Sequence, residues 1–280
     1  MPESIVPENL KTNDICILGI PFDDNSSFRK GSGLAPARIR ESLFSPSSNL
    51  WSEQGIDLGS LENLHDLGDL NCSEPDTLFD RIGQRLVPLV RNKARMICLG
   101  GDHSITFPII QAHAQEYPNL NILHLDAHPD LYNELDNNRF SHACPFARIM
   151  ENKLAERVVQ AGIRTMNGLQ KDQATRLGVE VIEMKMGIEP IFQMEFQGPL
   201  YLSLDMDCLD PAFAPGVSHH EPGGLSTRQV IELIQRVKCR LIGADIVEYN
   251  PERDLMSMTS MTAAKLLKEI ISRIYLDNRR

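Results

Sequence analysis

The sequence has no long apolar run and no segment rich in Lys and Arg. No stretch approaches the ~20 consecutive apolar residues that a membrane-spanning helix requires. Its 28 Lys and Arg are outnumbered by 38 Asp and Glu, and the formal net charge is −10. A phosphate backbone would therefore be repelled rather than attracted. We expect neither a membrane protein nor a nucleic-acid-binding protein, and the acidic charge favours a cationic ligand.

Paired cysteine motifs and targeting signals are also absent. The six cysteines are widely spread, without a C-x-x-C pair, so we expect reduced thiols and no zinc site built from them. The first 14 residues, MPESIVPENLKTND, are acidic and polar and contain no positive region ahead of an apolar run. We therefore expect neither a secretory signal nor an Arg-rich transit peptide, and we predict a cytoplasmic location.

Short apolar runs alternate with amphipathic stretches along almost the whole chain. Runs of this length that are apolar on both faces are typical of strands covered by helices on two sides. The eight predicted strands are Ile15–Pro21, Leu64–Leu70, Met96–Gly100, Asn121–Ala127, Val158–Ile163, Val179–Ile182, Leu200–Asp205 and Leu241–Val247. Their alternation with helices predicts an α/β fold, in which a mostly parallel sheet of about eight strands lies between two helical layers.

Helical spacing is found between and after these runs. The apolar residues of 78–86 and of 266–274 recur at intervals that place them on one face of a helix. The segment Ser226–Gln229 has the pattern of a capping box, which begins another helix. No Pro-, Gly- or Ser-rich linker divides the chain, so we expect a single domain over residues 1–280.

Polar clusters follow four of the predicted strands. These clusters are Gly100–Ser104, Asp126–Asp130, Ser203–Pro211 and Asp245–Glu248. In a parallel sheet the functional loops lie at the carboxyl ends of the strands. We therefore expect the four clusters to meet at one edge of the sheet and to form the functional site there.

Two of these clusters place ionisable side chains at alternate positions. Successive side chains of a strand point to opposite faces. If the extended conformation persists, Asp126, His128 and Asp130 therefore share one side, as do Asp205 and Asp207. Four carboxylates brought together repel one another unless a proton or a cation relieves the charge. With the histidine of the first cluster, the expected ligands are His103, Asp126, His128, Asp130, Asp205 and Asp207.

The type and number of these ligands indicate which metal they suit. Carboxylates and neutral imidazoles without thiolates suit Mn²⁺, although Zn²⁺, Fe²⁺ and Co²⁺ are compatible with the same ligand types. Six ligands are too many for one catalytic ion with open positions, whereas two divalent ions balance four Asp charges. A D-x-D motif alone is usually a solvated loop or a cap, so the prediction depends on the motifs occurring together.

The clusters resemble the ureohydrolase family of arginases and agmatinases, and the resemblance extends over nearly the whole chain. Residues 124–132 and Phe140–Cys144 are most similar to plant-type arginases. The resemblance implies an arginase-like fold, hydrolysis of a guanidino group, two Mn²⁺ per subunit and a homo-oligomer, either a trimer or a hexamer. Further matching segments are Gly19–Phe22, Arg29–Gly31, Pro36–Arg40, Gly162–Thr165, Pro215–Gly216, Gly223–Leu225 and Asp245–Pro251.

The resemblance also implies roles for single residues. His142 matches a histidine that passes a proton to the leaving amine, and Glu248 matches an acidic residue that holds the substrate guanidinium. Without the resemblance, His142 would be interpreted as an exposed histidine of a loop and Glu248 as a charged residue at a strand end. The resemblance further implies that His103 and Asp126 bind one ion and that His128 and Asp207 bind the other. Asp130 and Asp205 would bind both ions.

The choice of guanidino substrate depends on groups that bind a carboxylate. Asn138, Arg139 and Ser141, just ahead of the predicted proton shuttle, offer a cation and neutral donors, which favours L-arginine. Against this, residues 221–225 resemble the corresponding stretch of agmatinases, and Ala143 replaces a glycine that many members have. We expect L-arginine, with agmatine or another guanidino or formimino compound as the alternative.

Other interpretations are open at this point. A two-metal phosphoesterase could use the same ligands, although its loops would need more basic residues, and a relative that binds metal without catalysis is also possible. His124 is expected to be a histidine satisfied within the core rather than a partner of the metal ligands. His219 and His220 are adjacent and point in different directions on a strand, so we expect them in a substrate loop or on the surface rather than as a metal pair.

Overall fold

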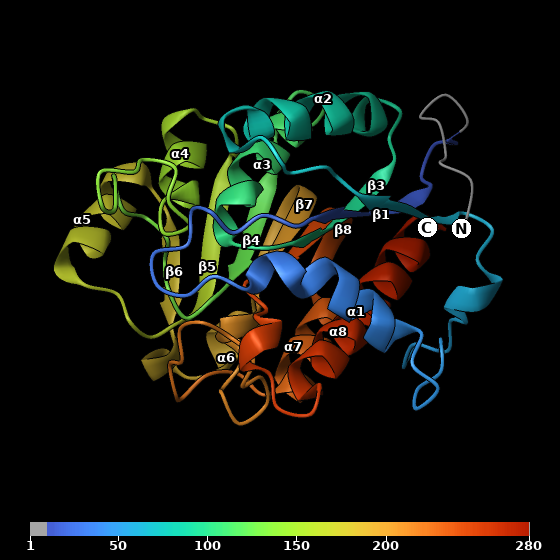
Figure 1. The fold of residues 1–280 in the computed structure, drawn as a ribbon. Helices are drawn as coiled ribbons and strands as arrows, with labels where there is room; N and C mark the ends of the chain where they lie inside the picture. Colours follow the sequence, from blue (N-terminus) through green and yellow to red (C-terminus); the bar gives the residue numbers. More distant parts are fainter. Residues whose placement is uncertain (1–9, 280) are drawn as a thin grey trace.

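The computed structural model describes residues 10–279, and within them eight strands form one parallel sheet (Figure 1). Every strand predicted from the sequence is present, in the order β2-β1-β3-β8-β7-β4-β5-β6 across the sheet. The prediction that the first 14 residues contain no targeting peptide falls partly outside the described residues. The strands are β1 (Ile15–Ile20), β2 (Leu64–Asp69), β3 (Arg95–Gly100), β4 (Asn121–Leu125), β5 (Arg157–Ile163), β6 (Glu180–Glu183), β7 (Glu195–Asp205) and β8 (Lys238–Val247).

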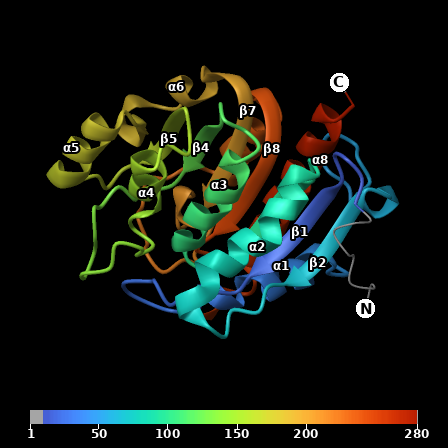
Figure 2. The same cartoon turned by 90° about the horizontal axis from the view of Figure 1, so that it is seen from above.

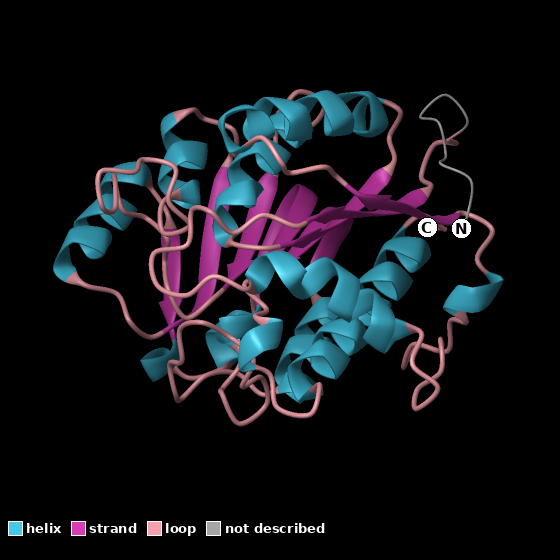
Figure 3. Cartoon of the chain, in the orientation of Figure 1, coloured by secondary structure: helices cyan, strands magenta, loops and turns pink. Residues whose placement is uncertain are grey.

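Helices cover both faces of the sheet, which confirms the three-layer α/β/α prediction (Figures 1 and 3). One face is covered by α1 (Ala35–Leu43), α6 (Glu189–Phe192), α7 (Thr227–Arg236) and α8 (Met258–Asp277). The other is covered by α2 (Leu78–Arg91), α3 (Thr106–Ala114), α4 (Pro145–Glu151) and α5 (Gly168–Leu177). Seen from above in Figure 2, α2 and α3 lie over the sheet and run roughly along the direction of its strands.

The strands separate two hydrophobic cores. In β3, Ile97 and Leu99 pack into the core shared with α1, α7 and α8, whereas Met96 and Cys98 pack into the core shared with α2 and α3. All four side chains are fully buried. This alternation follows from the two-residue period of a strand, and it explains why the run is apolar at every position.

Two strands begin earlier than their apolar runs suggest. β7 begins at Glu195 and β8 at Lys238, and these two residues are paired in register at the ends of the strands. Both side chains are exposed and form an ion pair with each other. An exposed strand end carries polar residues, so the apolar pattern could not reveal it.

Local signals in the sequence agree with the helix boundaries. Ser226 and Gln229 form the predicted capping box at the start of α7, with each side chain bonded to the backbone N–H of the other residue. None of the helices within residues 10–279 is long and apolar enough to cross a membrane. All six cysteines are free thiols, as expected.

The sheet order places four functional loops side by side. β3, β8, β7 and β4 are consecutive in the centre of the sheet, and all run in the same direction. The polar cluster that follows each strand therefore lies at the same edge. This arrangement brings segments more than a hundred residues apart in the sequence to one place.

Candidate metal centre

His103 enters the interior at the end of β3, through the 3-10 helix η5 (His103–Ile105). Asp102 caps η5 by accepting a hydrogen bond from its backbone. The preceding turn needs glycine, because a Cβ on Gly101 would lie 1.8 Å from a backbone carbonyl oxygen of the neighbouring segment. The turn buries the His103 side chain completely.

The two ring nitrogens of His103 have different surroundings. Nε2 lies 3.0 Å from the Ser203 hydroxyl, which itself donates a hydrogen bond of 2.7 Å to the carboxylate of Asp245. Because the hydroxyl proton is given to Asp245, the Ser203 oxygen accepts a hydrogen bond from Nε2–H. In the neutral ring, Nδ1 therefore carries the lone pair, which points away from Ser203.

Nδ1 of His103 faces three carboxylates. It has no hydrogen-bond partner among the described residues, and one oxygen each of Asp205, Asp130 and Asp126 lies at 3.1, 3.2 and 3.3 Å from it. Burial alone would lower the pKa of His103, but these carboxylates raise it well above its usual value. A buried ring nitrogen surrounded by three carboxylate oxygens therefore takes up positive charge, either a proton or a metal cation.

A second group of ligands lies around His128. Its Nδ1 is 3.0 Å from Oδ2 of Asp207 and 3.4 Å from Oδ1 of Asp126. Asp126 thus contacts the imidazoles of both His103 and His128. Of these two imidazoles, Asp130 contacts that of His103. Asp126 lies between the two groups, and the division of the ligands between two ions that the resemblance implies stays a prediction.

Tight turns bring these ligands together, rather than extended strands. β4 ends at Leu125 before its motif begins, and the backbone of Asp130 has a φ of 49°. Asp126 accepts a hydrogen bond from the His128 N–H at 2.6 Å, and Asp205 accepts one from the Asp207 N–H at 2.8 Å. The first Asp of each motif therefore folds its own turn, as short acidic side chains commonly do.

The carboxylates of this cluster are held close together without solvent. Burial raises the pKa of Asp205 well above its usual value, and the neighbouring carboxylates of Asp207 and Asp126 raise it further. Burial and Asp126 likewise raise the pKa of Asp207. Divalent cations would relieve this excess negative charge, and the donors are all oxygen or imidazole nitrogen. The six predicted ligands are thus together, and they fit a metal centre.

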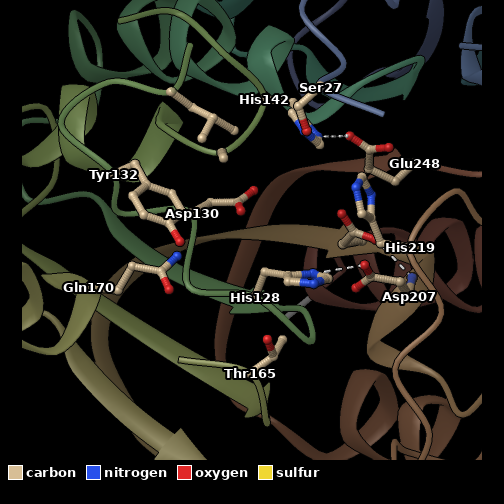
Figure 4. Close-up of a pocket in the computed structure, with 13 residues that line it drawn as sticks. Ser27, His128, Asp130, Tyr132, His142, Thr165, Gln170, Asp207, His219 and Glu248 are labelled. Atoms are coloured by element: carbon tan, nitrogen blue, oxygen red, sulfur yellow. Dashed lines mark hydrogen bonds and ion pairs between the residues drawn. The ribbon is translucent and has the colours of Figure 1, made fainter. Parts of the chain in front are cut away.

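The two predicted catalytic residues lie beside the ligands and contact each other (Figure 4). Nδ1 of His142 is 2.9 Å from Oε1 of Glu248, and its Nε2 is 2.8 Å from the Ser27 hydroxyl. The same Glu248 oxygen accepts a hydrogen bond from the His103 backbone N–H at 3.0 Å. Burial alone would lower the pKa of His142, but the Glu248 carboxylate raises it to about 9.

Glu248 is held in a strained turn at the end of β8. Its φ is 63°, in the left-handed region that a residue other than glycine rarely adopts. The backbone N–H of Glu248 donates to the Gly101 carbonyl at 2.8 Å, which ties this turn to the one that carries His103. Strain of this kind persists where the surrounding structure fixes it, commonly at functional sites.

A cavity of about 150 Å³ opens between the ligands and the catalytic pair. Besides six of the predicted residues, it is lined by His219 and by Ser27, Tyr132 and Gln170, to which the sequence had assigned no role. His219 had been expected in a substrate loop or on the surface, and its ring centroid lies 5.4 Å from that of His142. No Lys or Arg of the described chain lines the cavity.

The three residues predicted to bind the substrate carboxylate do not line this cavity. Asn138 donates to the Asn25 side chain at 2.9 Å, and Arg139 pairs with Glu151 at 3.2 Å. Ser141 is buried beneath the loop. The loop from 131 to 141 folds on itself, so its polar groups bond within the protein, and their role in substrate binding stays a prediction.

Comparison with known proteins agrees with this geometry. A family model described as the arginase family matches residues 13–272. The chain is 42% identical to "Arginase 1, mitochondrial" of Arabidopsis thaliana, over 92% of this chain and 80% of that protein. The chain therefore belongs to the arginase family of ureohydrolases, and it is an arginase-family hydrolase. Enzymes of this family depend on a binuclear metal centre, which the clustered His and Asp side chains could hold.

Solved structures of the family have the same fold. The arginase from Medicago truncatula has a TM-score of 0.87 and 36% identity, over 95% of this chain and 88% of that one. The agmatine ureohydrolase of Thermoplasma volcanium has a TM-score of 0.84 and 31% identity, over 95% and 92%. Relatives that act on different guanidino compounds thus share this architecture, so the fold alone does not select the substrate.

Proposed function

We propose that the protein hydrolyses L-arginine to L-ornithine and urea, with two Mn²⁺ per subunit. The observation that carries this proposal is the clustering of six candidate ligand side chains, four of which line one small cavity together with the His142–Glu248 pair. Four Asp charges balance two divalent ions, and oxygen and imidazole donors without thiolate suit Mn²⁺. When bound, such a pair of ions acidifies a water molecule and so supplies a nucleophile near neutral pH.

Glu248 orients the substrate in this proposal. A guanidinium group is planar and cationic, and a carboxylate oxygen accepts charge-assisted hydrogen bonds from its N–H groups. The hydrogen bonds from the described residues go to Oε1 of Glu248, which leaves Oε2 for the substrate. Because the Glu248 turn is tied to the His103 turn, the guanidinium carbon is held against the ligand cluster.

His142 supplies the proton that the leaving nitrogen needs. Beside the Glu248 carboxylate, the pKa of His142 is raised to about 9, so the imidazole is protonated at neutral pH. The C–N bond to the departing amine breaks as His142 gives its proton to that nitrogen, releasing urea and the amine. The Ser27 hydroxyl at Nε2 orients the ring for this transfer.

Agmatine is the second candidate, and one observation favours it. L-arginine carries an α-carboxylate that agmatine lacks, yet no Lys or Arg of the described chain lines the cavity. Arg139, predicted to meet that carboxylate, pairs with Glu151 instead. L-arginine is supported by the identity to arginase 1 of Arabidopsis thaliana. The same lack of cations disfavours a phosphate ester as substrate.

A substrate panel tests the proposal. The Mn²⁺-loaded protein is supplied in parallel with L-arginine, agmatine, guanidinobutyrate and formiminoglutamate, and the release of urea, or of formamide from the last, is measured. We expect the largest kcat/KM with L-arginine. A larger value with agmatine would favour the second candidate. Absence of product from every compound would leave a metal-binding relative without catalysis.

Assembly and location are part of the same proposal. We propose a homo-oligomer, either a trimer or a hexamer, that acts in the cytoplasm. Family members are commonly oligomeric, whereas several relatives carry "mitochondrial" in their names. Sedimentation equilibrium of the purified protein tests the assembly, because a mass of 31.5 kDa would identify a monomer.

A further inference from the structure

A buried chain of polar side chains lies behind the metal ligands. Gln160 on β5 and His124 on β4 are paired in register across the two strands, and both side chains are fully buried. Gln160 contacts His124, and His124 contacts the ligand Asp126. Buried polar groups of this kind need defined partners, so the direction of each hydrogen bond can be worked out.

The orientation of the Gln160 amide is fixed by a backbone carbonyl. Its Nε2 lies 2.5 Å from the carbonyl oxygen of Pro129 and 3.0 Å from Nδ1 of His124. A carbonyl oxygen can only accept, so the amide must present N–H and not oxygen to Pro129. The second N–H of the same amide group then faces Nδ1 of His124.

This orientation determines which nitrogen of His124 carries the proton. Nδ1 faces an N–H donor, so it must accept, and the ring proton is on Nε2. Nε2 lies 2.7 Å from Oδ2 of Asp126 and donates to it.

The His124 ring is also held mechanically. It stacks on Phe146 with a centroid distance of 3.8 Å and an interplanar angle of 21°. The edge of His103 packs against it at 4.9 Å and 74°. A 180° flip of the ring would keep this packing but would put Cδ2 and Cε1 where the two nitrogens lie, so the contacts with Gln160 and Asp126 fix the ring orientation.

We propose that Gln160 is a positioning residue of the metal centre, acting through the His124 tautomer to hold the Asp126 carboxylate between the two ligand imidazoles. This inference rests on the metal centre of the proposed function. Its Pro129 contact also ties Gln160 to the loop that carries His128 and Asp130. His124 and its neighbours could by proximity hold an ion, but both ring nitrogens are already engaged, so His124 is not a ligand. His124 is buried as expected, but the expectation that it would not be a partner of the candidate ligands was wrong, because it contacts Asp126.

Manganese affinity tests the role of the amide. Gln160→Met keeps the length of the side chain and removes its donors, and we expect roughly tenfold weaker Mn²⁺ binding by isothermal titration calorimetry. Gln235→Met is the matched control, because Gln235 on α7 also donates an amide hydrogen bond, to Glu269, away from the ligands. The control should bind Mn²⁺ like the unmodified protein. Equal affinities for the unmodified protein and Gln160→Met would overturn the proposal.

A double-mutant cycle tests whether Gln160 acts through His124. His124→Phe keeps a ring on Phe146 but has no nitrogen, so adding Gln160→Met to it should cause no further loss of Mn²⁺ affinity. A second tenfold loss in that background would show that Gln160 acts by another route, either through its Pro129 contact or by general disruption of the core. That result would contradict the proposed route, even with all variants folded.

The tautomer itself is observable by long-range ¹H–¹⁵N NMR on the unmodified, chelator-treated full chain. We expect the pattern of a ring protonated at Nε2 for His124. A proton on Nδ1 would overturn the inference, since Nε2 would then be free to bind a metal. This measurement needs no bound Mn²⁺ and no substrate. A protein that hydrolyses none of the compounds in the substrate panel could therefore still show the Nε2-protonated His124 that the Gln160 proposal predicts.

Discussion

Nδ1 of His142 and Oε1 of Glu248 lie 2.9 Å apart, so the predicted proton donor and the predicted substrate-binding carboxylate are bonded to each other. Each group sets the charge of the other. The carboxylate raises the pKa of His142 to about 9, and the imidazole lowers the pKa of Glu248 although burial would raise it. The pair is therefore ready as an imidazolium and a carboxylate at neutral pH, before a guanidinium arrives.

Removal of the imidazole should separate catalysis from metal binding. His142→Ala should lower kcat by about a hundredfold or more, because general acid catalysis contributes about that much. Both Mn²⁺ should stay bound, since His142 contacts none of the six predicted ligands by a hydrogen bond. Metal content by mass spectrometry is measured beside kcat. If Mn²⁺ were lost together with activity, His142 would be a structural part of the centre.

The pKa of His142 should depend on its partner. Glu248→Gln removes the charge that raises this pKa, so the pKa should fall from about 9 toward or below the ordinary value of about 6.5. NMR titration of the His142 ring measures it. The same titration of Asp172→Asn, an exposed acid on α5, should show no change. An unchanged pKa in Glu248→Gln would mean that another group charges the imidazole.

The pair should also stabilise the fold in a defined pH window. The folded pKa of about 9 lies above the unfolded value of about 6.5, so the contribution is complete below pH ~6.5 and is lost as pH rises through about 9. The free energy of unfolding in urea is compared for the unmodified protein and Glu248→Gln, both free of metal. Their difference should shrink steadily between these pH values. A difference that grows toward pH 9 would have the wrong sign for this pair.

The sheet could be predicted because each strand is covered on both faces and so is apolar throughout. The convergence of the six candidate ligands could be predicted because they lie at or just after the ends of β3, β4 and β7, and strand ends meet at one edge. The expected mechanism of convergence was wrong: turns capped by Asp126 and Asp205, not continued strands, bring the side chains together.

Residues carried by long loops could not be predicted in this way. Ser27 lies in the loop after β1 and reaches His142 across 115 positions of sequence. No local pattern records such a contact. Conversely, Asn138 and Arg139 lie next to the site in sequence, but their side chains bond to Asn25 and Glu151. Loop side chains take the nearest polar partner, and that partner is set by the tertiary fold.

Neutralising one ligand should change metal-free stability and metal binding in opposite directions. Burial and two nearby carboxylates raise the pKa of Asp205 well above its usual value, so its charge destabilises the metal-free protein. Asp205→Asn should therefore melt at an equal or higher temperature in chelator. Addition of Mn²⁺ at 100 times its Kd stabilises the unmodified protein by about 3 kcal/mol and should not stabilise this variant. Melting curves with and without Mn²⁺ check both, and a lower melting temperature in chelator would contradict the charge argument.

Arg164 should be essential to the loop that carries Asp207. Its Nη2 donates to the carbonyl oxygens of Asp207 at 2.7 Å and Leu209 at 3.2 Å, and its Nε donates to that of Glu221 at 2.8 Å. Arg164→Met leaves these carbonyls without their donor, so we expect a loss of about 3 kcal/mol in unfolding free energy and weaker Mn²⁺ binding. Arg164→Lys should restore little, because one ammonium group cannot reproduce the planar set of donors.

A surface arginine provides the control for this effect. Arg157 forms a paired contact with Glu180 and donates to one carbonyl, that of Glu195, and the Arg157 and Glu180 side chains are partly exposed. Arg157→Met should cost less than about 1 kcal/mol, as is usual for exposed ion pairs, and should leave Mn²⁺ affinity unchanged. Urea unfolding and calorimetric titration of both variants make the comparison. Equal losses for the two arginines would mean that the carbonyl contacts of Arg164 do not hold the Asp207 loop in place.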